Sequence, residues 1–295
     1  MTELVDAQFY TSLKTTLVPT NGAGTPAFTR ATTKNVFDNE GKLITVRSGA
    51  VTLGGARRVE NLYTQKSEDV THPSWFPVNV TTPSTDTVKC VASTASMWIY
   101  ADSSSSVVVG DVIAATFRVQ YVDIRYIQLV GKGPAIDDAA RCNFDLVDGD
   151  YTATNCIVTM TAVSAGIWDI TFIANIIVDS SSFAVFLALA TSQTAARVQA
   201  FEGDGIKSVK IIRSQIEIIT GQSVQAAGEY VSVGVLSSPY HGGGADGVKY
   251  FDTDSSGVAI PDATMLGLHI DHESKTNNLL WCRDLTNAAW VKTNA

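Results

Sequence analysis

The sequence predicts an all-β fold: an antiparallel β-sandwich of jelly-roll type, with an extended N-terminal arm and a C-terminal partial repeat. Apolar and polar residues alternate with a period of two along several segments, which is typical of half-buried strands. Turn-forming residues separate these segments at intervals that suit antiparallel neighbours. Only 17% of the residues are charged, whereas about 25% is usual, and many Ser, Thr, Val and Ile take their place.

The composition also excludes several functional classes. The 295-residue chain is long enough to bury a core without metals or disulfides. A net charge of −8 leaves no broad basic surface for phosphates, so we expect no nucleic-acid partner. The first residues contain no apolar signal segment, and the longest apolar run, Phe183–Ala190, is too short to cross a bilayer. We therefore expect no membrane partner and synthesis in a cytoplasm.

The strands can be placed from their periodicity. Apolar residues occupy alternate positions in residues 113–121, in 168–178 and in 231–235, and Trp168 at the head of the second stripe is expected in the core. Residues 183–190 are apolar on both faces, which predicts a strand buried between two layers. The apolar phase of residues 209–218 shifts near Ile212, which indicates a β-bulge.

The four cysteines show neither a CxxC pair nor zinc spacing. Cys142 and Cys156 each lie seven residues from Gly149, so a three-residue hairpin loop there would set them opposite each other. Two alternatives remain open from sequence: a cross-strand disulfide, or two buried thiols that fill one sheet face.

The chain divides into three parts. Residues 1–60 are rich in Gly, Pro and turn residues and are expected to form an arm and linker; residues 61–220 form the sandwich. Residues 221–295 are expected to be a linker and the start of a second similar module.

An internal echo supports this division, because motifs recur in order about 215 residues later. The pairs are Phe37-Asp38 with Gly41 and Phe251-Asp252 with Gly257; Asn61-Leu62 and Asn278-Leu279; and Asp69 to Trp75 and Asp284 to Trp290.

Several short motifs occur in a fixed order along the chain. The first are Phe28-Thr-Arg-Ala-Thr32, Asp38 to Gly41, Arg58-Val-Glu-Asn-Leu62 and Trp75. Later come Gly166-Ile-Trp168, Gly203-Asp-Gly205, Gln215-Ile-Glu217 and a linker-like stretch over residues 229–252.

Together, over about residues 10–295, these motifs resemble a module common in tailed-bacteriophage virion proteins. The match to its "GW" strand is inexact, because Ile167 separates the Gly from the Trp. The resemblance implies a carbohydrate-binding-like jelly roll in a head-spike, head-fibre or tail-fibre protein, and it carries over no catalytic residue.

Three motifs with possible chemistry have simpler interpretations. Residues 242–247 match GxGxxG, but the following Val-Lys-Tyr-Phe segment is strand-like, so a linker is favoured over nucleotide binding. Residues 252–257 match the first half of a calcium loop, yet Ala263 occupies the position of the bidentate acid, which favours a turn. In an extended chain, His269 and His272 would face opposite sides, which splits a metal site.

Aromatic residues in candidate strands are the one group that suits a ligand. Trp98 and Tyr100 share one strand face, and Trp75 lies in a neighbouring candidate strand. Such rings can stack on the apolar face of a pyranose, although a strand aromatic more often packs in a core. Trp75, Trp98 and Tyr100 are therefore the candidate glycan-binding residues.

The sequence thus predicts a non-enzymatic structural protein of a bacteriophage virion, a head fibre or capsid-decorating protein made in the host cytoplasm. No nucleophile motif, metal or cofactor site is predicted. The expected partners are other virion proteins and further copies of the chain, with a host surface glycan as a further candidate. The alternative is a tail-fibre adhesin that recognises host polysaccharide; a polysaccharide-degrading enzyme is a third possibility.

Overall fold

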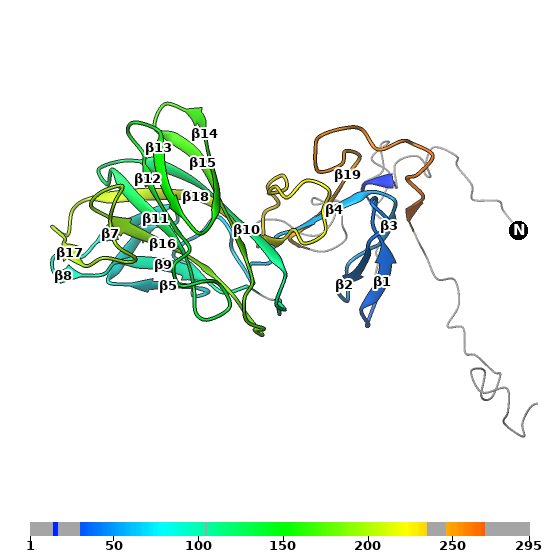
Figure 1. Cartoon of the computed structure of the whole chain (residues 1–295), viewed down its shortest axis with the longest axis horizontal. Helices are drawn as coiled ribbons and strands as arrows, with labels where there is room; N and C mark the ends of the chain where they lie inside the picture. The colour runs from blue at the N-terminus through cyan, green and yellow to red at the C-terminus, as the bar shows by residue number, and fades with distance from the viewer. Residues whose placement is uncertain (1–13, 17–29, 104, 235–245, 269–295) are drawn as a thin grey trace, which may run out of the picture.

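The computed structural model describes residues 14–16, 30–103, 105–234 and 246–268. In these ranges two six-stranded antiparallel sheets pack as a sandwich, and no α-helix occurs. The predicted all-β antiparallel sandwich is confirmed. Figure 1 shows the sandwich on the left and a smaller group of strands, built from both ends of the described chain, on the right.

The two sheets are named here by their spatial order. The first contains β14 (Ile157–Ser164), β15 (Ile167–Asn175), β10 (Val112–Tyr121), β18 (Ser208–Ile218), β7 (Thr87–Cys90) and β6 (Val80–Ser84). The second contains β13 (Asp150–Thr154), β12 (Arg141–Asp145), β11 (Tyr126–Gly131), β16 (Val185–Ala190), β9 (Trp98–Ala101) and β5 (Trp75–Val78). A short pair, β17 (Phe201–Glu202) with β8 (Thr94–Ala95), lies beside them.

The core lies between the sheets and uses the predicted stripes. Alternate residues of β10 from Ile113 to Val119 are fully buried, and so are Ile170 and Phe172 of β15. Each sheet sends every second side chain inward, because successive strand residues point to opposite faces. Trp168 is partly buried and packs against this core, and its indole nitrogen donates to the Leu146 carbonyl at 2.9 Å.

The expected bulge in β18 is confirmed. Arg118 of β10 pairs with Arg213, but the next residue, Val119, pairs with Ile211, so Ile212 is the extra residue. The bulge restores the inward phase, because Ile211 and Ile216 are both fully buried on either side of it.

The predicted Cys142–Cys156 register is wrong. The hairpin pairs Asp145 with Asp150 and therefore places Cys142 opposite Ala153. The loop is one residue longer than expected, and Asp145 stabilises it by accepting the backbone N–H groups of residues 147 and 148. Cys142 and Cys156 are free thiols in this structure.

In the predicted stripe over residues 231–235, the described residues 231–234 are largely buried but do not form a ladder strand. Val231 and Val233 are 1% and 5% exposed. Their backbone N–H groups donate to the side chains of Gln215 and Ser67. Side-chain acceptors here replace a neighbouring strand, which is why periodicity identified the burial but not the hydrogen bonding. Val235 lies outside the described residues.

Segments from the two ends of the described chain pair with each other. β4 (Arg57–Glu60) pairs with β19 (Val248–Phe251), and β3 (Leu53–Gly54) pairs with β20 (Gly267–Leu268). They enclose a small core of Val51, Leu53, Ala56, Val248 and Tyr250. Residues 30–60 and 246–268, which include the hairpin β1 (Lys34–Phe37) and β2 (Leu43–Val46), are called the terminal unit below.

The first echo motif is only partly reproduced, because the turn that begins at Asp38 recurs at Asp254, two residues after the Asp252 of the motif. Asp38 N–H donates to the Lys42 carbonyl, and Asp254 N–H donates to the Val258 carbonyl in the same way. In each turn the aspartate side chain accepts backbone N–H groups and a glycine takes a positive φ. The later echo motifs, Asn278-Leu279 and Asp284 to Trp290, lie outside the described residues.

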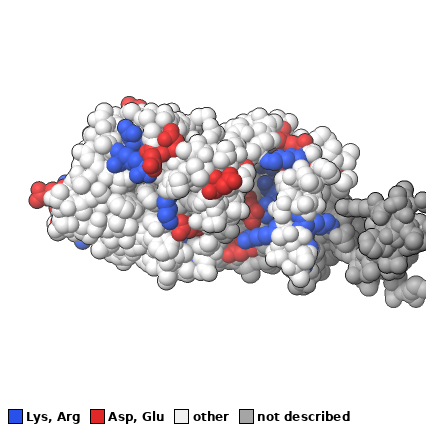
Figure 2. Space-filling model, turned by 60° about the horizontal axis from the view of Figure 1, so that its bottom comes forward, with Lys and Arg blue, Asp and Glu red and all other residues white. Residues whose placement is uncertain are grey.

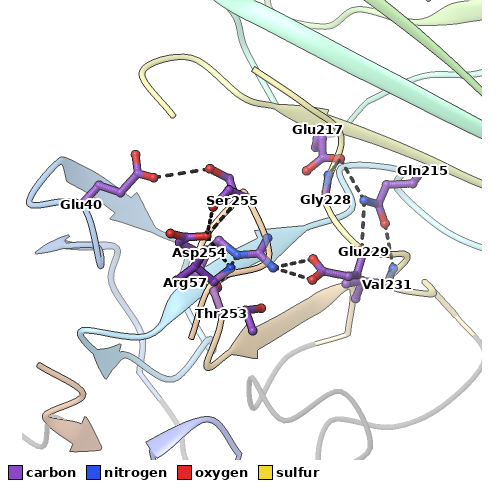
Figure 3. A network of polar contacts seen from close by, with 12 residues as sticks. Glu40, Arg57, Gln215, Glu217, Gly228, Glu229, Val231, Thr253, Asp254 and Ser255 are labelled. Atoms are coloured by element: carbon purple, nitrogen blue, oxygen red, sulfur yellow. Dashed lines mark hydrogen bonds and ion pairs between the residues drawn. The ribbon is translucent and has the colours of Figure 1, made fainter. Parts of the chain in front are cut away.

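A polar network joins the terminal unit to the sandwich (Figure 3). Arg57 of β4 donates to both carboxylate oxygens of Glu229 at 2.6 and 2.5 Å, and its Nε donates to the Thr253 carbonyl. The Arg57 side chain is only 7% exposed. Glu229 is 47% exposed, and both hydrogen bonds come from the Arg57 Nη2 nitrogen, so this charge-assisted pair links β4 to the segment that follows β18.

Glu217 is the most deeply buried acid of this network. Its Oε1 accepts the Gly228 N–H at 2.7 Å and the Gln215 amide at 3.0 Å. Burial raises the pKa of Glu217 to about 7, and the two hydrogen bonds and Arg57 only partly oppose this shift. Figure 3 shows the Glu217 carboxylate pointing toward Gly228 and Gln215.

The fold therefore binds one more proton than the unfolded chain between about pH 4.5 and 7. We expect stability to fall as pH rises through this window, by on the order of 1–3 kcal/mol from Glu217 alone. Glu217→Gln should flatten this slope, because the amide oxygen can still accept both hydrogen bonds. Urea unfolding at pH 5 and pH 8 measures the effect, with exposed Glu202→Gln as the control; equal slopes in Glu217→Gln and wild type would contradict it.

Candidate functional site

The direction of β9 places the predicted aromatics on the outer face of the second sheet. Ile99 and Ala101 are fully buried in the core. Trp98 and Tyr100 alternate with them and therefore point outward, where both are half-buried. The structure thus brings Trp98 and Tyr100 onto one face of one strand.

Two phenylalanines extend this pair into a continuous surface. Phe76 of β5 pairs with Tyr100 in register, and their rings stack at 5.1 Å between centroids. Phe186 of β16 lies 5.0 Å from the Tyr100 ring and 5.9 Å from the Trp98 ring. Phe76, Trp98, Tyr100 and Phe186 are called the aromatic face below.

An ion pair borders the aromatic face. The Lys132 ammonium lies 4.1 Å from the Tyr100 ring centroid and 2.7 Å from Asp102 Oδ1. Partial burial lowers the pKa of Lys132, but the hydrogen bonds to Asp102 and Tyr100 outweigh it, so the net shift is upward. Lys132 is therefore a cation at neutral pH, and the Tyr100 ring contacts it on one side.

A loop over residues 195–198 covers the neighbouring part of the same sheet face and does not extend over the aromatic face. Gln128 of β11 donates to Asn143 at 2.7 Å and accepts the Val198 N–H at 2.8 Å. Asn143 in turn donates to the Ala195 carbonyl. Because this loop satisfies the buried amides, the outer face divides into a covered polar half and an uncovered aromatic half.

Trp75 does not belong to the aromatic face. It is 3% exposed, its indole nitrogen donates to the Lys66 carbonyl at 2.9 Å, and Tyr63 packs 5.6 Å away. Phe76, the next residue, takes the outward position and is 44% exposed. The structure therefore separates Trp75, a packing residue, from Trp98 and Tyr100.

Sequence reasoning missed Phe76 and Phe186. Phe76 directly follows Trp75, and successive residues of a strand point to opposite faces. Assigning Trp75 to the core would therefore have placed Phe76 on the outer face. Phe186 lies in a run that is apolar on both faces, and only its partners across the sheet show that it is a surface residue. No signal within that run separates Phe186 from its buried neighbours.

A second hollow, of about 410 Å³, lies beside the polar network at the terminal unit. Its cations are already bound within the protein: Arg57 pairs with Glu229, Arg58 with Glu60 at 2.5 Å, and Lys42 donates to the Thr220 carbonyl. The three cations therefore all contact protein oxygens, while Arg58 Nε is buried without a hydrogen-bond partner among the described residues.

The remaining motifs are placed as follows. Asp254 uses Oδ1 to accept the backbone N–H groups of Ser256 and Val258, which is the geometry of a turn. Asp246 accepts the Gly234 N–H, and residues 242–245 of the glycine-rich run lie outside the described residues, as do His269 and His272. Among the residues that the structure covers, no three metal-ligating side chains gather, and no helix is long and apolar enough to cross a membrane.

One face of the sandwich carries little charge. On the face of the molecule in Figure 2, acidic and basic side chains form small mixed groups, and most of the sandwich surface is uncharged. Ligand attraction over long distances is therefore weak, and recognition depends on contact with rings and hydrogen-bonding groups.

No protein-family model matches the chain, and a search of curated proteins finds no significant match. The site is therefore described from its own geometry.

The two tryptophans of the neighbouring strands should differ in their contribution to stability. Trp75→Ala removes a buried ring and its hydrogen bond, and we expect a loss of about 3–5 kcal/mol. Trp98→Ala removes a half-exposed ring, and we expect about 1 kcal/mol or less. Urea unfolding followed by circular dichroism measures both, and equal losses would contradict the assignment of Trp98 to the surface.

Proposed function

We propose that this chain is a non-enzymatic, surface-displayed protein of a bacteriophage virion, and that its sandwich binds host-surface polysaccharide through the aromatic face. The outward-facing cluster of the exposed Phe76 and the half-buried Trp98, Tyr100 and Phe186 carries this proposal. The ordered motifs similar to phage virion modules support the virion setting. We also infer that the sandwich is of jelly-roll type and that the C-terminal segment begins a second module.

The chemistry of the aromatic face suits a sugar. One face of a pyranose ring is lined by C–H groups, which stack on aromatic rings, while its hydroxyl groups need hydrogen-bond partners. Tyr100, Lys132 and Asp102 supply donors and acceptors at the border of the rings. The rings hold one another in place by stacking, so binding orders few side chains.

The aromatic face is also elongated. Phe76, Tyr100 and Phe186 come from three neighbouring strands. The Tyr100 ring centroid lies 5.1 Å from that of Phe76 on one side and 5.0 Å from that of Phe186 on the other. A surface of this shape favours a chain of sugars that lies across the strands over a single sugar in a deep pocket.

A second candidate is the structural role of a head fibre or capsid-decorating protein, anchored through its N-terminal part to other virion proteins. The tip of the β1–β2 hairpin favours it, because Phe37 and Leu43 pair there and are 66% and 56% exposed. An exposed apolar pair of this kind is suited to contact with another protein.

A glycan array of bacterial surface polysaccharides tests the binding proposal. We expect the wild-type chain to bind one class of polysaccharide and the double variant Trp98→Ala, Tyr100→Ala to lose at least tenfold in affinity. Phe37→Ala, which removes an exposed aromatic of the terminal unit, is the matched control and should bind normally. Absence of binding by the wild type, or normal binding by the double variant, would refute the proposal.

Immunogold electron microscopy of virions separates the two candidates. An antibody against residues 60–235 should label the tail if the chain is an adhesin, and the head if it is a fibre or decorating protein. Intact particles without label, from lysates that contain the protein, would contradict both.

A further inference from the structure

The edge strands of the sandwich differ in how they are protected. Each exposed edge offers backbone donors and acceptors to another strand, and proteins usually block it with Pro, charge or a short strand. β5 contains Pro77 and β6 contains Pro83, each within the strand itself. β13 has five residues and begins with Asp150. These three edges therefore carry recognisable protection.

β14 is the exception. It is an eight-residue edge strand whose sequence, Ile-Val-Thr-Met-Thr-Ala-Val-Ser, contains neither Pro nor a charge. Among the residues that the structure describes, β15 is its only ladder partner, so one side of its backbone has no described strand beside it. A bulge near its end, between Ala162 and Ser164, leaves residues 157–162 in regular register. This strand is long and regular enough to pair with another strand.

The surroundings of β14 are equally neutral. Residues 151–168 contain no Asp, Glu, Lys, Arg or His, in a chain with a net charge of −8. Ile157 is 63% exposed and Val163 is 43% exposed. Two copies of this chain repel each other over most of their surfaces, but not where their β14 edges meet.

We propose that β14 is the contact surface between two copies of this chain. The two strands pair antiparallel across a twofold axis and join the first sheets into one continuous twelve-stranded sheet. A register centred on Met160 sets Thr159 opposite Thr161 of the second copy, which repeats on both sides of the axis. A contact of this kind uses the same patch twice and closes as a dimer.

The sequence of β14 favours a second copy of the same strand as its pairing partner. An antiparallel pair of identical strands satisfies both rows of free backbone groups at once, and the exposed threonines match on the outer face. The pairing goes beyond the proposed function and does not depend on it, because β14 and the aromatic face belong to different sheets. Figure 1 shows β14 at the upper edge of the sandwich and β5 and β9 at the lower side.

The arrangement has a consequence for binding. β5, β9 and β16 lie at the opposite end of their sheet from β13, which adjoins β14 in the chain. The dimer therefore leaves both aromatic faces uncovered and presents two of them to one polysaccharide. Two linked weak sites bind a repeating ligand more tightly than either site alone.

Sedimentation-velocity ultracentrifugation of the full chain, with reductant and over a hundredfold range of concentration, tests the proposal. We expect a dimer in the wild type. Thr159→Lys with Thr161→Lys places like charges opposite each other on an exposed face and should weaken dimerisation at least tenfold, with circular dichroism and thermal midpoint unchanged. Thr81→Lys with Thr85→Lys adds the same charge at the opposite edge and should leave the dimer intact.

A charge exchange provides the specific confirmation. Thr159→Glu with Thr161→Glu should also be monomeric, and mixing it with the lysine variant should restore a mixed dimer. A wild type that stays monomeric at the highest concentration would overturn the proposal. A dimer that survives the lysine pair at β14, or that dissociates equally with the β6 control, would overturn it as well.

Discussion

The inward burial of Ile99 between the two sheets determines which aromatic side chains the second sheet presents on its outer face. Side chains alternate along a strand, so a buried Ile99 forces Trp98 and Tyr100 outward. A slip of one residue would bury both rings and expose Ile99, and the dense core on the inner face opposes such a slip. The aromatic face is thus a consequence of core packing, and its rings gain their fixed positions from the same constraint.

The joint between the sandwich and the terminal unit obeys a different constraint. Its side chains come from segments far apart in the chain, and Glu217 is buried with neutral donors nearest to it. Gln215 and Glu217, part of the motif that resembles a phage-module signature, form hydrogen bonds within this joint. The Gln215 side-chain oxygen accepts the Val231 N–H, and the Glu217 carboxylate accepts the Gly228 N–H. These residues therefore have a structural role at the joint.

Local patterns in the sequence predicted much of the fold. The stripes of β10 and β15 and the bulge at Ile212 follow from periodicity, because core burial imposes it directly. The hairpin at Cys142 was misplaced because loop length depends on Asp145 capping the turn, which periodicity does not report. The pairing of β4 with β19 joins residues almost two hundred positions apart and left no local signal.

The candidate site could also be predicted only in part. Trp98 and Tyr100 share a strand, so their common face could be inferred from sequence alone. Phe76 and Phe186 join them only through cross-strand register, which is set by the whole sheet. Trp75 looked equivalent to Trp98 in sequence, and what separates them is a hydrogen bond to Lys66 and burial against Tyr63.

The most direct test of the aromatic face is a nuclear magnetic resonance titration that follows the indole N–H signals. The probes are oligosaccharides of neutral and acidic hexoses prepared from bacterial surface polysaccharides. The account predicts a saturable shift of the Trp98 signal, while the signals of Trp75 and Trp168, whose indoles are bonded to backbone carbonyls, stay in place. Shifts confined to Trp75 or Trp168, or no shift with any probe, would contradict it.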